Sequence, residues 1–130
     1  MSTTALGILL RHLREEGNLS LRELGDRANL DHAYIYRLEK GDKGAPSEEV
    51  VARLAKALEL MDREREILEF VAGWPDTDPE LARLATTDHS ITSEEFSAAA
   101  APAFRGRARP DPRTLIERAR RILREEAEDG

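Results

Sequence analysis

The chain has 130 residues, which is enough for one domain or two small ones, and its net charge is −6. It has no cysteine, so disulfides and thiolate metal sites are excluded. No apolar run approaches the roughly 18 residues of a membrane helix, and no signal peptide is evident. We therefore expect a cytoplasmic protein with no membrane partner. Its richness in Ala, Leu, Glu and Arg, without an alternating strand pattern, favours an all-α fold.

The first segment of the chain predicts two helices in quick succession. A leucine stripe marks a helix over about residues 4–16, and it consists of Leu6, Leu9, Leu10 and Leu13. Ser20 and Glu23 then have the spacing of a capping box, in which each side chain accepts from the other residue's backbone N–H. They start a short second helix that breaks near Asn29.

A third helix follows at once. Asp31 is suited to cap it, Ile35 and Leu38 point inward, and Gly41 is suited to the left-handed position after its end. Two short helices joined by so tight a turn must cross steeply. Such a pair presents its second helix as a probe that fits the major groove of DNA.

The rest of the chain predicts five more helices in two groups. Ser47 and Asp62 are the expected caps of the fourth and fifth helices, and the pattern breaks at residues 73–76. We expect a five-helix DNA-binding domain over residues 1–73 and a small three-helix domain over residues 78–130. The second group starts at Asp78-Pro79, at a capping box over residues 92–95 and at Asp111-Pro112.

The last helix carries an apolar face, although residues 78–130 contain few large apolar groups to cover it. A domain of this size is marginal alone, so we expect the face to be buried against a second copy of the chain. This hypothesis makes residues 78–130 a dimerisation domain, and its contact residues are Leu115, Ile116, Ala119, Ile122 and Leu123.

The N-terminal segment resembles the lambda-repressor-like, or XRE, family of helix-turn-helix repressors. The matching positions are Ser20–Leu24, Leu30-Asp31, Tyr34–Gly41, and Pro46-Ser47 with Val50, Leu54 and Leu58. The resemblance implies a homodimer that binds a palindromic operator in double-stranded DNA, with His32, Ala33 and Arg37 reading bases. It also implies a structural ion pair between Arg14 and Glu39. The chain departs from the family at Leu21, where a phosphate-binding glutamine is common, and at Gly25, where alanine is usual.

Each candidate DNA contact also has a structural alternative. Arg37 can donate two bonds to guanine, or it can pair with a nearby acid at the surface. His32 can bind a base or a phosphate, or it can be solvated. Tyr34 and Tyr36 can offer hydroxyls to phosphate, or one of them, with Tyr34 favoured, can pack inward.

Further backbone contacts are expected at the start of the second helix and after the third. Ser20 and Arg22 lie where N–H groups and a cation can hold a phosphate, although capping alone explains Ser20. Lys43 lies in the following loop. Between Leu19 and Lys56 seven cations balance seven anions, so binding must depend on where the charges are placed.

Residues 78–130 resemble repressors that are cleaved by a partner zinc peptidase of the ImmA/IrrE type. The resemblance rests on Pro79–Leu84, Ile91-Thr92, Phe104–Pro110 and the last helix. It implies cleavage near Phe104 and Arg105, loss of the dimer, and control of stress, mobile-element or defence genes. Arg105, Arg107 and Arg109 can alternatively form a DNA-binding arm or a solvated linker.

Nothing in the sequence points to catalysis. The three histidines share no metal-ligand spacing, and no nucleophile or phosphate-loop motif occurs, so we expect no enzyme, cofactor or metal. The acidic balance leaves one alternative to a DNA-binding repressor. This is an antitoxin or interaction module whose main role is to bind a partner protein.

Overall fold

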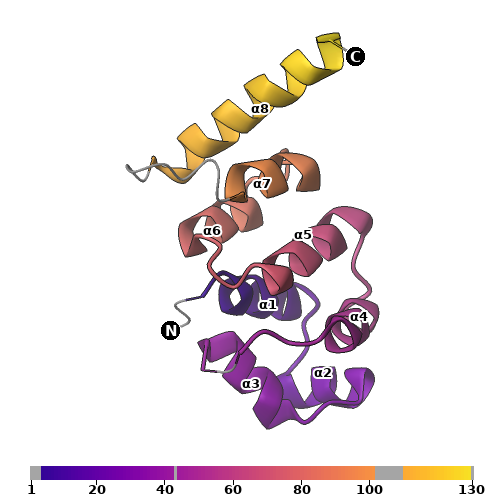
Figure 1. Cartoon of the computed structure of the whole chain (residues 1–130). Coiled ribbons are helices and arrows are strands. Elements are labelled where there is room, and N and C mark those ends of the chain that lie inside the picture. Colours follow the sequence, from indigo (N-terminus) through magenta and orange to yellow (C-terminus); the bar gives the residue numbers. More distant parts are fainter. Residues whose placement is uncertain (1–3, 43, 102–109, 130) are drawn as a thin grey trace.

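The computed structural model describes residues 4–42, 44–101 and 110–129, and these ranges form eight helices and no strand (Figure 1). The predicted all-α fold is confirmed, with five helices before the break at residues 74–78 and three after it. The helices are α1 (Ala5–Glu16), α2 (Leu21–Ala28), α3 (His32–Lys40), α4 (Glu48–Ala57), α5 (Asp62–Gly73), α6 (Pro79–Thr87), α7 (Ser93–Ala100) and α8 (Pro112–Asp129).

Side-chain caps start most of these helices where the sequence predicted them. In the capping box of α2, the Ser20 hydroxyl accepts from the Glu23 N–H and the Glu23 carboxylate accepts from the Ser20 N–H, both at 3.0 Å. The predicted capping box of α7 is also formed. The prediction for α5 is wrong, because Met61 is the N-cap and has no side-chain bond, while Asp62 is the first helical residue.

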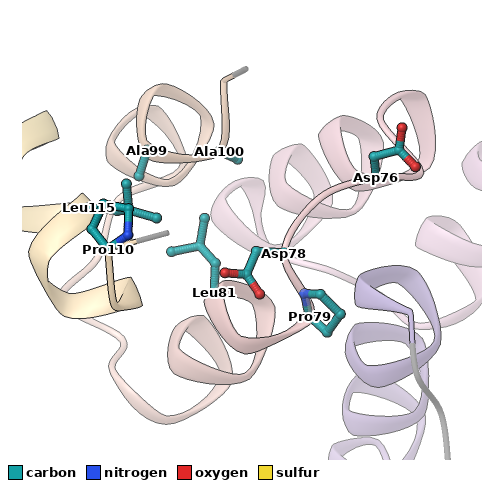
Figure 2. A pocket seen from close by; sticks show the side chains of 8 residues that line it. All are labelled: Asp76, Asp78, Pro79, Leu81, Ala99, Ala100, Pro110 and Leu115. Atoms are coloured by element: carbon teal, nitrogen blue, oxygen red, sulfur yellow. The ribbon is translucent and has the colours of Figure 1, made fainter. Parts of the chain in front are cut away.

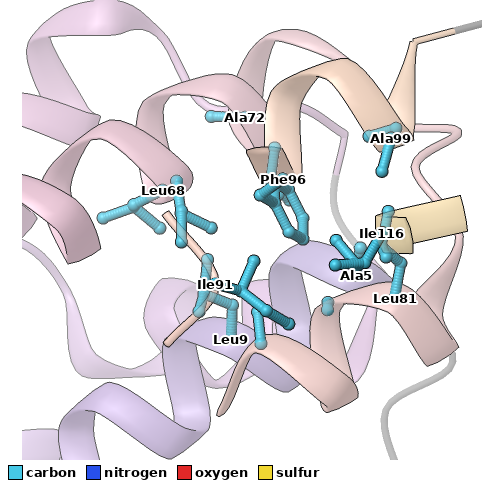
Figure 3. Close-up of a cluster of buried hydrophobic side chains, with 14 of the residues drawn as sticks. Ala5, Leu9, Leu68, Ala72, Leu81, Ile91, Phe96, Ala99 and Ile116 are labelled. Atoms are coloured by element: carbon cyan, nitrogen blue, oxygen red, sulfur yellow. The ribbon is translucent and has the colours of Figure 1, made fainter. Parts of the chain in front are cut away.

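The core consists of two clusters of buried apolar side chains. The smaller cluster contains side chains from α1, α2, α3 and α4, including Leu10, Leu24 and Ile35. The larger cluster contains side chains from α1, α4 and α5 together with others from α6, α7 and α8 (Figure 3). Phe96 of α7 lies in it fully buried. The proposed division at residues 73–78 stays a prediction, but the two halves of the chain share this core.

The apolar face of α8 is covered by its own chain, which corrects the premise of the predicted dimer contact. Leu115, Ile116 and Ala119 are buried in the larger cluster, so they offer no free surface to a second copy. The helices α6 and α7 cover this face of α8, and they are themselves packed on α1 and α5, so the face is completed within one chain. Leu123 is half-buried and Ile122 is 39% exposed, so only the end of the predicted face remains open.

The start of α8 packs against α6 and α7 and leaves a small cavity. A cavity of about 90 Å³ lies between these helices (Figure 2). Its lining consists of Asp76, Asp78, Pro79, Leu81, Ala99, Ala100, Pro110 and Leu115. Two ion pairs reinforce the contact, from Arg113 to Asp88 at 2.7 Å and from Arg120 to Glu95 at 3.2 Å.

Among the described residues, no helix is long and apolar enough to cross a membrane.

Candidate nucleic-acid interface

The inner side of α3 is fixed to the protein core. Ile35 is fully buried and Leu38 is 1% exposed, and both belong to the smaller cluster. Asp31 caps the start of the helix by accepting from the Ala33 N–H at 2.9 Å. Gly41 ends it with a φ of 81°, in the left-handed region that favours glycine. The position of α3 is therefore set at both ends and along its inner face.

A buried ion pair also holds α3, as the family resemblance implied. Arg14 of α1 donates from Nε and Nη2 to the two carboxylate oxygens of Glu39, at 2.7 and 3.0 Å. Its remaining Nη1 donates to the Leu19 carbonyl at 2.9 Å. The hydrogen bonds that Arg14 donates to Glu39 raise the pKa of Arg14 against the opposing effect of burial. This two-pronged pair fixes α3 in direction as well as in distance.

The outer side of α3 is open. His32, Ala33, Tyr36 and Arg37 are exposed on it, which places all three predicted base-reading residues on one free surface. The Arg37 side chain makes no hydrogen bond or ion pair with any described residue. Among these residues no acid pairs with its guanidinium, so base recognition by Arg37 stays a prediction.

One candidate on this surface was missed from the sequence. Lys40 is exposed at the end of α3, and its Nζ lies 5.2 Å from the centre of the Tyr36 ring. Such a cation–π contact restrains both side chains and leaves a positive charge beside Arg37. The spacing of four residues between Tyr36 and Lys40 was the available signal.

The predicted backbone contacts differ in how free they are. Arg22 and Tyr36 are exposed, whereas Tyr34 is half-buried and packs against the smaller cluster. Both the N–H and the hydroxyl of Ser20 are engaged by Glu23, and these bonds lower the pKa of Glu23. A phosphate at Ser20 would therefore meet an ionised carboxylate, which weakens that candidate. Lys43 lies outside the described residues.

The crossing of α2 and α3 is unusually close at Gly25. A Cβ atom built on this residue would lie 2.7 Å from the Leu30 carbonyl oxygen and 3.2 Å from the His32 nitrogen. The turn between the helices passes through Asn29, which has a left-handed φ of 56°. The absence of a side chain at Gly25 therefore lets the start of α3 lie directly against α2.

These features are those of a helix-turn-helix unit, and the sequence comparison agrees. Residues 5–68 match the family described as helix-turn-helix domain. This segment is an XRE-like helix-turn-helix domain. The match ends within α5, so it covers the smaller cluster and the whole of α3 but not α6, α7 or α8.

Two relatives extend the comparison further along the chain. They are the uncharacterised HTH-type transcriptional regulators Rv0474 and MT0491, from two strains of Mycobacterium tuberculosis. Each is 30% identical over 91 residues, which covers 68% of this chain and 62% of the relative. The chain thus spans about three fifths of their length. No solved structure matches the chain with significant similarity.

Proposed function

We propose that this chain is a homodimeric transcriptional repressor that acts by binding a palindromic operator in double-stranded DNA, without catalysis. One observation carries the proposal. The inner side of α3 is anchored by Ile35, Leu38 and the Arg14–Glu39 pair, while its outer side presents His32, Ala33 and a free Arg37. A helix fixed in this way can enter the major groove without rearranging.

Dimerisation would compensate for the weak electrostatic attraction between a single copy and DNA. One chain has no excess positive charge between Leu19 and Lys56, so its attraction to phosphate is small. Two copies double the contacts and read two half-sites about 34 Å apart, one helical turn along the duplex. The names of the two mycobacterial relatives, which are transcriptional regulators, fit this proposal.

Selection from a random duplex library, followed by gel shift at two salt concentrations, tests the proposal. We expect a palindromic consensus, saturable binding and weaker affinity at the higher salt concentration. Finding no enriched sequence, together with stable capture of a protein partner, would favour the interaction module or antitoxin instead.

Arg37→Ala gives the residue-level prediction. Loss of the guanidinium removes about 1–3 kcal/mol of discrimination at one base pair, and the preference elsewhere in the site is kept. Binding measurements on single-base operator variants detect this change. Arg83→Ala, which removes an exposed arginine from α6, is the matched control. An equal loss of affinity for every sequence would instead assign Arg37 to a phosphate.

We further propose that cleavage near Phe104 and Arg105, by a partner zinc peptidase of the ImmA/IrrE type, relieves repression. Both residues lie outside the described ranges, and the support is the resemblance stated above. After a cut, α8 would be held by its buried side chains, its ion pairs to Asp88 and Glu95, and the hydrogen bond from Arg120 to Ser90. Replacing residues 102–109 with a specific protease site and cutting the folded protein should lower operator affinity. Unchanged affinity would contradict this regulation.

A further inference from the structure

The far half of α8 lies away from the rest of the molecule. Figure 1 shows this end of the helix extending past α7. From Arg121 to Asp129 every residue is exposed except Leu123, which is half-buried. Ile122 is one of the few large apolar side chains that the described surface exposes. This segment, which we call distal α8, gains little stability from its own chain.

The charges of distal α8 oppose the helix dipole. Its last turns carry Glu125, Glu126, Glu128 and Asp129, and no basic residue occurs in the last turn. Carboxylates at a helix C-terminus meet the negative end of the dipole, so this order destabilises an isolated helix. An unfavourable local choice of this kind indicates that another interaction compensates for it.

The helical period places three residues of distal α8 along one edge with Arg118, which lies one turn before them. Arg118, Ile122, Glu125 and Asp129 follow each other at intervals of four, three and four positions. Arg118, Glu125 and Asp129 form no side-chain hydrogen bond or ion pair with any described residue. The edge thus has a free cation at one end, an exposed isoleucine near its middle and two free carboxylates at the other end.

We propose that this edge pairs with the same edge of a second copy, with the two helices antiparallel and the two Ile122 side chains in contact. Antiparallel pairing brings Arg118 of each copy between Glu125 and Asp129 of the other. The two opposed dipoles then also attract each other. Distal α8 becomes the dimer contact, in place of the buried residues Leu115, Ile116 and Ala119. The inference rests on the proposed homodimer and names its surface.

Charge complementarity within one edge favours a second copy over a different partner. The edge is self-complementary only when it is reversed, and a twofold axis supplies that reversal. A parallel arrangement would place Arg118 against Arg118 and acids against acids. Because the apolar contact is small, the ion pairs should carry much of the specificity, and dimerisation should weaken as salt rises.

Reciprocal charge reversal in the full chain tests the pairing. One variant is Arg118→Glu, and the other combines Glu125→Arg with Asp129→Arg. Each should dimerise roughly tenfold or more weakly than the wild type, because attraction becomes repulsion at both symmetric contacts. A 1:1 mixture should recover dimers, since opposite charges meet again in the heterodimer. Sedimentation at equal concentration gives the masses, and Arg83→Glu is the control.

Circular dichroism keeps folding separate from assembly. The variant with two new arginines has a better charge order for the helix dipole, so its helix content should not fall even though its dimer weakens. The pairing would be overturned if the wild type had the mass of a monomer. It would also be overturned if both variants dimerised as well as the wild type, or if their mixture stayed monomeric.

The proposed function is judged by a different readout. If it holds, the monomeric variants should still bind one operator half-site at higher protein concentration, because α3 is unchanged. Failure of the wild type to bind any DNA, with reciprocal rescue intact, would overturn the repressor and leave the pairing in place.

Discussion

Single residues fix the geometry of α3, and Gly25 shows how. In the family that the sequence resembles, alanine is usual at this position, and glycine is expected to weaken the helix. In the structure it is the residue that allows the Leu30 carbonyl and the His32 nitrogen to approach α2. The loss of helix propensity is about 1 kcal/mol, which is smaller than the strain of about 2–3 kcal/mol that a methyl group pressed against a backbone oxygen would introduce.

We expect Gly25→Ala to lower the free energy of unfolding by about 1–2 kcal/mol despite the better helix propensity of alanine. A contact of 2.7 Å to a backbone oxygen must be relieved by moving the start of α3, so operator affinity should fall as well. Urea unfolding measures the first effect and gel shift the second.

Gly73→Ala is the matched control, because a Cβ at that position meets nothing within 4 Å. It should leave stability unchanged or raised. Equal effects of the two substitutions would show that crowding at Gly25 does not matter.

The outer residues of α3 could be placed from the sequence, whereas Gly25 could not be understood from it. The helical period and two flanking caps decide which side chains face outward, and these signals are local. A close approach between two backbones depends on the turn through Asn29. That turn is visible only once both helices are placed.

At the level of elements, the turn between α6 and α7 links three helices. Asp88 accepts from the N–H and hydroxyl of Ser90, and it accepts from Nη1 of Arg113, at the start of α8, at 2.7 Å. Arg63 of α5 donates to the carbonyl of Ala85 in the last turns of α6 and to the carbonyls of Asp88 and Ile91 in the turn that follows. The position of α8 thus depends on a turn that α5 holds in place.

The Ser90 and Arg113 hydrogen bonds hold the pKa of Asp88 well below its ordinary value. A lowered pKa means that the ionised carboxylate stabilises the fold above the ordinary aspartate pKa of about 4, and that this contribution is lost as pH falls through the lower folded value. Asp88→Asn should therefore be less stable than the wild type at neutral pH, and the difference should shrink in strong acid.

Urea unfolding at a series of pH values measures this difference. Asp26→Asn, at an exposed acid on α2, is the control. A gap between wild type and Asp88→Asn that stays constant down to the acid limit would contradict the role assigned to the carboxylate.

On the scale of the whole molecule, the larger cluster joins both halves of the chain. Ile67 and Leu68 of α5 and Ile116 of α8 belong to it together with Phe96. From the sequence, the number and order of the helices could be predicted, because caps and stripes are local. The shared core could not, because an apolar stripe does not reveal whether its partner is in the same chain.

Ile116→Ala should lower the free energy of unfolding by about 2–5 kcal/mol, since the side chain is fully buried. We expect Trp74 fluorescence and far-ultraviolet circular dichroism to report one coincident transition that shifts as a whole. Trp74 suits this purpose because it lies at the break between the halves, 51% exposed and stacked on Phe70.

Met61→Ala, at a side chain that is 75% exposed, should leave the transition in place. Two separate transitions, of which only one responds to Ile116→Ala, would show that the halves unfold independently.

Arg63 also limits how freely the two halves of this chain can be combined with other segments. Its guanidinium, on the last helix of residues 1–73, donates to carbonyls that only a correctly placed α6 and the turn after it can supply. A chimera that joins residues 1–73 to an unrelated C-terminal segment would leave these N–H groups and the apolar face of α5 in water. The two halves are therefore expected to be inherited together rather than exchanged as modules.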